Sequence, residues 1–236
     1  MFCLDRPDFS PAFMNRSHVI PGVWLANGAM SMAGGSIRWF LREFAPELSG
    51  ERELEELACT APPGANGVLY VPYLCGERSP IFDAQALGLF FGLTAGTSKA
   101  DLARAVYEGL GHAMAQIYRI GTTRWNVFPP HVICIGGATR SDLSIHIRAN
   151  MQNVTMRTVE TSNAAAFGAA MMGGMAAGVF HDLWDVPVIE NYRSYVEPDA
   201  ETVQFYDGYQ EVYEELYPAL VDPMHRLSIL RKKSTN

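Results

Sequence analysis

The spacing of apolar residues along the chain predicts several helices. Residues 26–45, "ANGAMSMAGGSIRWFLREFA", fit one helix in which Gly34 and Gly35 form a weak or closely packed point. A short solvated helix is expected in the acidic run "ELSGERELEELACT". The strongest signals begin at Ser98, which can accept hydrogen bonds from the first helical turn and is followed by Asp101. Apolar residues then recur at helical spacing at Leu102, Val106, Leu110, Ala113, Met114 and Ile117.

Shorter apolar, β-branched and aromatic runs predict buried strands, namely "VLYVPYL", "GLFFGLT", "HVICIGG" and "VTMRTVE". The last two alternate with helices expected at about 141–151 and 163–177. This order of strand, helix, strand and helix predicts a right-handed crossover and an α/β layer. The last predicted helix carries a core-facing apolar stripe of Phe205, Tyr209, Tyr213 and Leu216.

The run "TSNAAAFGAAMMGGMAAGVFHDLW" is rich in Ala and Gly and admits two interpretations. It holds a GxxxG spacing from Gly174 to Gly178 and approaches the ~20 residues that span a bilayer. Its small side chains make it weakly hydrophobic, which favours a buried helix packed closely against a sheet. No membrane association is therefore expected.

Composition narrows the classes of function. The chain has 236 residues, of which 48% are hydrophobic, and a formal net charge of -7. Its only basic run is the "RKK" of the tail, so no nucleic-acid partner is expected. The four cysteines form no CxxC pair, which favours neither a zinc site nor a disulfide framework and fits a reducing, cytoplasmic location.

A pair of glycines is the clearest local candidate for ligand binding. In "ICIGGATRSDL" a predicted strand ends at Gly136 and Gly137, and a helix begins a few residues later. Backbone N–H groups that a ligand can approach closely suit a phosphate or an adenine ribose. The chain contains neither the GxGxxG nor the GxxxxGK[ST] pattern, so a nucleotide site and a tight turn both stay open.

Other charged residues give weaker signals. Glu77 and Arg78 follow an apolar strand and fit either a structural ion pair that staples a loop or the polar lining of a cleft. The six histidines form no HxxxH pair, and spacing alone names no general base among Asp83, Asp101 and Glu108.

Four motifs taken together carry a family resemblance. Gly88–Leu93, Asp101–Leu102 and Ala105–Glu108 match the second signature of the FGGY carbohydrate kinases, and "GERSP" precedes them as in the xylulokinase-like branch. "IGGATRSDL" is similar to the adenosine-side GG motif of that family, and "AAAFGAAMMGGMAAG" to its late Ala/Gly helix. The resemblance covers nearly the whole chain in order.

The resemblance implies an α/β, ribonuclease H-like fold of the actin and hexokinase type, with a mixed sheet flanked by helices. It implies transfer of a phosphoryl group from ATP, with Mg²⁺, to a hydroxyl of a sugar or polyol. "GERSP" favours a pentulose such as xylulose, whereas "SHVIPGVW" and "RWF" are similar to the autoinducer-2 kinase branch.

Site residues follow from the same resemblance. Gly136, Gly137 and Ala138 are expected beside the adenosine and phosphates of ATP, with Ser141 presented to the base or ribose. Gly92 is expected to border the nucleotide. Glu77 and Arg78 are placed near the interdomain hinge.

The resemblance further implies that residues 1–236 form the C-terminal, ATP-side domain, with the N-terminal sugar-binding domain and its catalytic base absent from the chain. The chain alone is then expected to be inactive, and an exposed sheet edge favours a homodimer. The alternative is a non-catalytic interaction or regulatory module that retains the fold.

Overall fold

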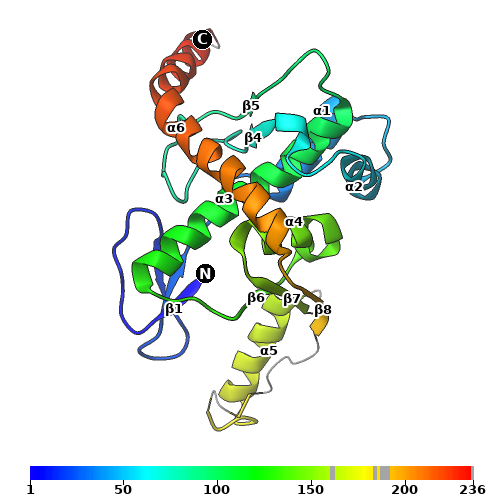
Figure 1. Cartoon of the computed structure of the whole chain (residues 1–236). Coiled ribbons are helices and arrows are strands. Elements are labelled where there is room, and N and C mark those ends of the chain that lie inside the picture. Colours follow the sequence, from blue (N-terminus) through cyan, green and yellow to red (C-terminus); the bar gives the residue numbers. More distant parts are fainter. Residues whose placement is uncertain (160–162, 183–184, 187–191, 235–236) are drawn as a thin grey trace.

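A computed structural model describes residues 1–159, 163–182, 185–186 and 192–234 (Figure 1). Within them, strands form three small sheets. The first sheet is antiparallel, with the order β1-β3-β2, and contains β1 (Phe2–Leu4), β2 (Met14–Ser17) and β3 (Trp24–Asn27). The second is the antiparallel pair of β4 (Leu69–Val71) and β5 (Leu89–Phe91).

The third sheet is mixed and has the order β6-β7-β8. Its strands are β6 (His131–Cys134), β7 (Thr155–Val159) and β8 (Tyr192–Val196). β6 and β7 run parallel, joined by a helix as the sequence predicts, whereas β8 runs antiparallel to β7. Because β6 and β7 run parallel, their carboxyl ends lie at the same end of the sheet.

Helices make up most of the remaining structure. They are α1 (Gly34–Phe44), α2 (Glu51–Cys59), α3 (Lys99–Trp125), α4 (Asp142–Gln152), α5 (Ala164–Ala176) and α6 (Ala200–Ser234), with 3₁₀ turns η1 (Ala65–Gly67) and η2 (Gly137–Arg140). Figure 1 shows α6 crossing α3. The largest core cluster joins α1, α2, β4 and α3 through residues such as Phe40, Leu54, Tyr70 and Val106.

The predicted start of α3 is confirmed. Ser98 is the N-cap, and its Oγ accepts a hydrogen bond of 3.2 Å from the N–H of Asp101. The Asp101 carboxylate in turn accepts the Ser98 N–H at 2.8 Å, which completes a capping box.

The predicted helix at 26–45 is wrong in its first part. Trp24–Asn27 forms β3, which pairs with β1 on one side and β2 on the other, and the helix begins only at Gly34. The neighbouring strands decide the outcome, because Ala26 is fully buried between partners that local periodicity does not reveal. The sequence also gave no prediction of β1, β2 or β8.

The stripe predicted on the last helix is partly wrong. Tyr213 and Leu216 are buried, but Phe205 is 42% exposed and the next residue, Tyr206, takes the buried place. Tyr206 is drawn inward because its hydroxyl finds buried hydrogen-bonding partners on α3.

The Ala- and Gly-rich helix α5 also differs from expectation. It forms over the predicted residues, with the Asn163 side chain accepting from the N–H of Ala166, but none of its residues is buried. It is therefore not the buried helix that the composition favours. Across the described residues, none of the helices combines the length and apolar character that a membrane span needs.

Candidate nucleotide-binding site

The glycine pair lies in an exposed loop directly after β6. Gly136 has a φ of +86°, in the left-handed region that residues with a side chain rarely adopt. The carbonyl oxygen of Gly136 accepts the Thr139 N–H at 3.1 Å and the Thr139 hydroxyl at 2.7 Å. These two bonds hold the loop as a tight turn, η2, whose glycines remain at the surface.

Among the described residues, packing does not explain why Gly137 lacks a side chain. A Cβ added at Gly136 or at Gly137 meets none of their atoms within 4 Å, so they leave the space in front of both glycines open. At Gly136 the backbone conformation itself favours glycine, but Gly137 has no such positive φ. Open space beside an exposed backbone is what a phosphate or ribose approaching this loop needs.

The start of α4 is already well capped. Ser141 is its N-cap and accepts the Ser144 N–H at 3.1 Å, while Glu55 of α2 accepts the Leu143 N–H at 2.8 Å. Two first-turn donors of α4 therefore have partners. These two N–H groups are therefore not free for a phosphate, and the backbone before the helix, from Gly136 to Ala138, is the part of the loop that could donate to one.

Gly92 has a packing reason to be glycine. Its φ is +87°, and an added Cβ would lie 2.2 Å from the carbonyl oxygen of Gly67. This close approach joins β5 to the turn before β4. Contact between Gly92 and a nucleotide stays a prediction.

Glu77 and Arg78 join the loop after β4 to the segment after β3 by hydrogen bonds. The carboxylate of Glu77 is buried and accepts the N–H groups of Ser31 at 2.6 Å and of Arg78 at 2.7 Å. The Arg78 guanidinium donates to the carbonyl oxygen of Met30 at 2.6 Å. Burial raises the pKa of Glu77, although these N–H donors oppose the shift. Glu77 and Arg78 thus hold the segment after β3 by bonding to backbone groups of that segment. Their expected position near the interdomain hinge stays a prediction.

Asp83 ties the same loop to α6. Its carboxylate accepts the Tyr217 hydroxyl at 2.9 Å and lies 2.6 Å from Nε2 of His225. Burial acts to raise the pKa of Asp83, but the bonds from His225, the Gln85 N–H and Tyr217 hold it below its usual value. Asp83 thus bonds to its own loop through Gln85 and to α6 through Tyr217 and His225, which is a structural role.

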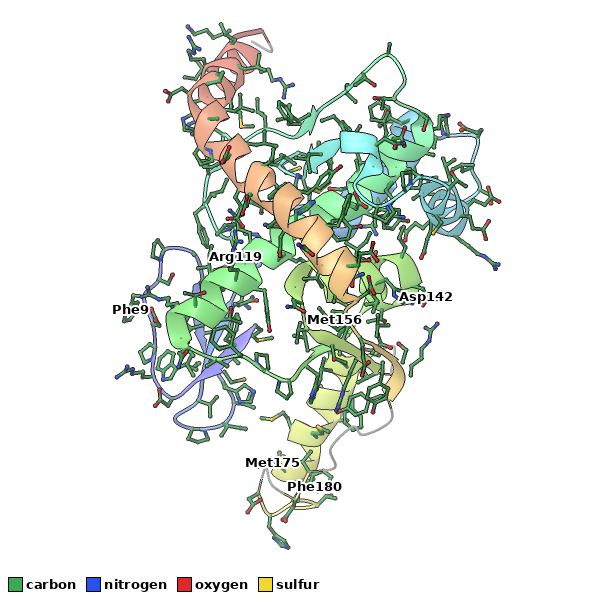
Figure 2. The ribbon with its side chains drawn as sticks, in the orientation of Figure 1. Phe9, Arg119, Asp142, Met156, Met175 and Phe180 are labelled. Carbon is green, nitrogen blue, oxygen red and sulfur yellow. The ribbon has the colours of Figure 1, made fainter. Side chains whose placement is uncertain are left out.

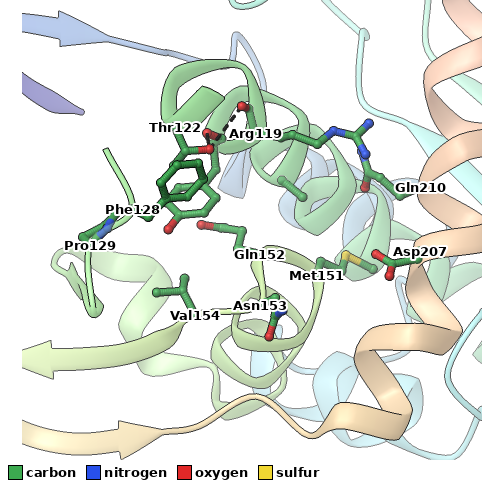
Figure 3. Close-up of a pocket in the computed structure, with 12 residues that line it drawn as sticks. Arg119, Thr122, Phe128, Pro129, Met151, Gln152, Asn153, Val154, Asp207 and Gln210 are labelled. Carbon is green, nitrogen blue, oxygen red and sulfur yellow. Dashed lines mark hydrogen bonds between the residues drawn. The ribbon is translucent and has the colours of Figure 1, made fainter. Parts of the chain in front are cut away.

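A separate cavity of about 330 Å³ lies between α3, the end of α4 and α6 (Figure 3). Its lining includes Tyr118, Arg119, Gln152, Asp207 and Gln210. None of the site residues expected from the sequence borders it. We favour the Gly136–Gly137 loop over this cavity because the loop combines open space at two adjacent glycines with a position between the end of β6 and the start of α4.

Comparison with known proteins decides the family. The model of the C-terminal domain of the FGGY family of carbohydrate kinases matches residues 1–177. The chain belongs to this family. It is 32% identical over 202 residues to xylulose kinase of Staphylococcus epidermidis, which covers 85% of this chain and 40% of that protein. It is 29% identical over 187 residues to glycerol kinase of Enterococcus faecalis, with 78% of this chain and 37% of that protein covered.

Solved structures agree with the FGGY assignment. Ligand-bound xylulose kinase from Lactobacillus acidophilus has a TM-score of 0.85 and 25% identity, covering 95% of this chain and 46% of that chain. Xylulose kinase from Rhodospirillum rubrum has a TM-score of 0.82 and 26% identity, covering 94% and 45%. The predicted ribonuclease H-like fold is confirmed. The FGGY chain described here spans about 40% of the length of the curated relatives it matches.

The FGGY signature contains residues whose role the sequence did not reveal. Glu108, at its end, is buried and accepts hydrogen bonds from Nε of Arg104 at 2.7 Å, the Tyr206 hydroxyl at 2.7 Å and the Gly64 N–H at 3.1 Å. Burial raises the pKa of Glu108, against the effect of these donors. The spacing of Arg104 and Glu108, one helical turn apart, was the only sequence signal for this cluster.

Proposed function

We propose that this chain is the nucleotide-side domain of an ATP-dependent sugar kinase. The backbone of Gly136, Gly137 and Ala138 borders the adenosine and phosphates of ATP, with Ser141 beside the base or ribose. The observation that supports this is the exposed loop after β6, in which neither the backbone conformation of Gly137 nor packing against the described residues requires a glycine. The relatives named xylulose kinase support a pentulose as the sugar.

The described residues fit one part of the reaction, the binding of the nucleotide phosphates. A bound nucleotide would bring its phosphates to backbone donors that need no charged side chain. Among the described residues no group of three or more His, Cys, Asp or Glu side chains could hold a metal ion. Mg²⁺ usually binds through one or two carboxylates together with substrate phosphates, and we propose no protein ligand for it among the described residues.

Calorimetric titration of ATP into the purified chain tests the nucleotide role. Gly137→Val fills the open space without forcing an unfavourable φ, so it should weaken ATP binding at least tenfold while leaving the melting temperature nearly unchanged. Gly208→Val is the matched control, because Gly208 of α6 also has open space around its Cβ position and valine is no worse than glycine inside a helix. Equal ATP affinity of Gly137→Val and the unaltered chain would remove this loop from the site. A folded chain that ignores ATP would instead favour a non-catalytic module.

Sugar phosphorylation is a separate question, since the chain spans about 40% of its relatives' length. We propose that transfer to a pentulose needs the remaining part of the kinase. A coupled assay of ADP release with D-xylulose and with glycerol should show no turnover by the chain alone. Robust turnover would contradict this proposal.

A further inference from the structure

A carboxylate from a distant helix lies at the start of α4. Oε1 of Glu55, in α2, accepts the Leu143 N–H at 2.8 Å, across 88 positions of the chain. Figure 2 shows Asp142 at the start of α4, which lies below α2 in this view. Leu143 follows Asp142 directly, so the bond fixes the Glu55 carboxylate beside the first turn of α4. This turn comes just after the Gly136–Gly137 loop and η2.

Glu55 differs from the other glutamates of α2 in its contacts. The other three are exposed and have partners on α1, in α2 itself or just before α2. They are Glu51, Glu53 and Glu56. Glu55 is half-buried, and the described residues offer it no second hydrogen bond or ion pair. A carboxylate can accept several hydrogen bonds, so Oε2 of Glu55 has room for a further donor.

Charge distinguishes the two ends of the segment between β6 and α4. Arg140 of η2 is an exposed cation close to the glycine loop, whereas Glu55 and Asp142 place two carboxylates at the first turn of α4. Carboxylates repel the phosphates of a nucleotide and attract groups that donate hydrogen bonds. The phosphates are therefore favoured at the end with the glycines and Arg140, and the base is favoured at the start of α4.

The order of residues along the chain gives the same orientation. In the function proposed above, the backbone of Gly136–Ala138 borders the adenosine and phosphates, and Ser141 lies beside the base or ribose. Leu143, which holds Glu55, comes two positions after Ser141 and so lies further along from the phosphate donors. A carboxylate at this place suits the base, because the base is the part of a nucleotide furthest from its phosphates.

We infer that Glu55 selects adenine by accepting a hydrogen bond from the exocyclic amine of the base. The inference rests on the proposed function and names the base that the site prefers. Adenine carries an amino group at the position where hypoxanthine and guanine carry a carbonyl oxygen. A carbonyl oxygen placed against Oε2 of Glu55 would bring two acceptors together with no proton between them. Unpaired polar contacts of this kind lower affinity strongly.

Calorimetric titration of the chain with ATP and with inosine triphosphate (ITP), whose base is hypoxanthine, tests the inference. The unaltered chain should bind ATP at least about tenfold more tightly than ITP. Glu55→Gln keeps an oxygen for the Leu143 N–H and adds an amide that can donate to the carbonyl oxygen of ITP. The preference for ATP should therefore largely disappear in Glu55→Gln. Glu56→Gln, at an exposed position of the same helix, is the matched control and should keep the preference.

A role of Glu55 in capping α4 alone predicts a different result. Glu55→Gln would then keep the ratio of ATP to ITP affinity, and an unchanged ratio would overturn the inference. Equal affinities of the unaltered chain for ATP and ITP would overturn it too.

Titration with 2′-deoxy-ATP separates the other donor of the nucleoside, the ribose hydroxyl. The ratio of ATP to 2′-deoxy-ATP affinity should be the same in the unaltered chain and in Glu55→Gln. A ratio that falls in Glu55→Gln would assign the contact to the ribose and contradict the inference. A chain that binds no nucleotide contradicts the proposed function and the inference together, whereas ATP binding with an unchanged ATP to ITP ratio in Glu55→Gln contradicts the inference alone.

Discussion

The hydroxyl of Tyr206 donates a hydrogen bond of 2.7 Å to Oε1 of Glu108, which lies 98 positions earlier in the chain. Both side chains are buried, and the same carboxylate oxygen also receives Nε of Arg104. This contact fixes the crossing of α6 over α3. Glu108, the last residue of the FGGY signature, therefore connects α3 to α6. Its carboxylate finds its hydrogen-bond donors inside the domain.

Removing the Tyr206 hydroxyl should weaken the whole domain. Tyr206→Phe keeps the ring but leaves Glu108 with one donor fewer in a buried site, which costs about 1–3 kcal/mol of unfolding free energy. Urea denaturation measures the loss. Tyr195→Phe, at a tyrosine that is 57% exposed, is the control and should change stability by less than about 0.5 kcal/mol. Equal effects of the two variants would mean that the Glu108 contact contributes nothing.

His112 should make stability fall as the solution becomes acidic. Burial lowers its pKa from 6.5 to about 4, partly opposed by the hydrogen bond with Gln210, so the folded state binds a proton less readily than the unfolded state. The stabilising contribution is complete above pH 6.5 and is lost as the pH falls toward 4.

Unfolding free energies at pH 7.5 and pH 5 measure this effect. The unaltered chain should lose about 2 kcal/mol more than His112→Gln over that interval. Burial raises the pKa values of Glu77 and Glu108, which acts in the opposite direction, but both carboxyls are present in the two proteins and cancel in the comparison. Parallel pH profiles would show that His112 is not held neutral by burial.

Gly109 should tolerate no side chain. Its Cβ position lies 2.1 Å from the Tyr70 carbonyl oxygen in β4, so Gly109→Ala forces α3 away from the strand and should cost more than about 2 kcal/mol. Gly208→Ala is the matched change in α6, where the space is open, and should raise stability by up to about 1 kcal/mol. Thermal unfolding of both variants checks the opposite signs. A stable Gly109→Ala would contradict the close approach of α3 to β4.

Glu77 should act through its hydrogen-bond acceptor and not through its charge. Glu77→Gln keeps an oxygen for the N–H groups of Ser31 and Arg78, whereas Glu77→Leu removes it. Hydrogen exchange at residues 29–31 should therefore be nearly unchanged in Glu77→Gln and clearly faster in Glu77→Leu. Equal exchange in both variants would contradict the loop-holding role.

Local signals in the sequence predicted those parts of the fold that local interactions determine. The Ser98 capping box and the strand–helix–strand unit around Gly136 depend on residues a few positions apart, and both formed as predicted. Trp24–Asn27 became a strand because of partners at β1 and β2, and Tyr206 turned inward because of Glu108. No periodicity within one segment contains that information.

The candidate site, too, could be predicted only in part from local signals in the sequence. The sequence identified Gly136 and Gly137, but only the structure shows that open space faces Gly137 while Gly67 fills the space beside Gly92. Likewise, composition favoured a buried α5, and the structure shows that none of its residues is buried.

Hydrogen exchange of the chain with and without saturating ATP tests the central claim most directly. The nucleotide loop and the start of α4, residues 135–145, should exchange at least several-fold more slowly with ATP, and Gly137→Val should remove that protection. The cavity lined by Tyr118 and Gln152 should be unaffected. Protection confined to that cavity, or no protection in residues 135–145, would contradict the account.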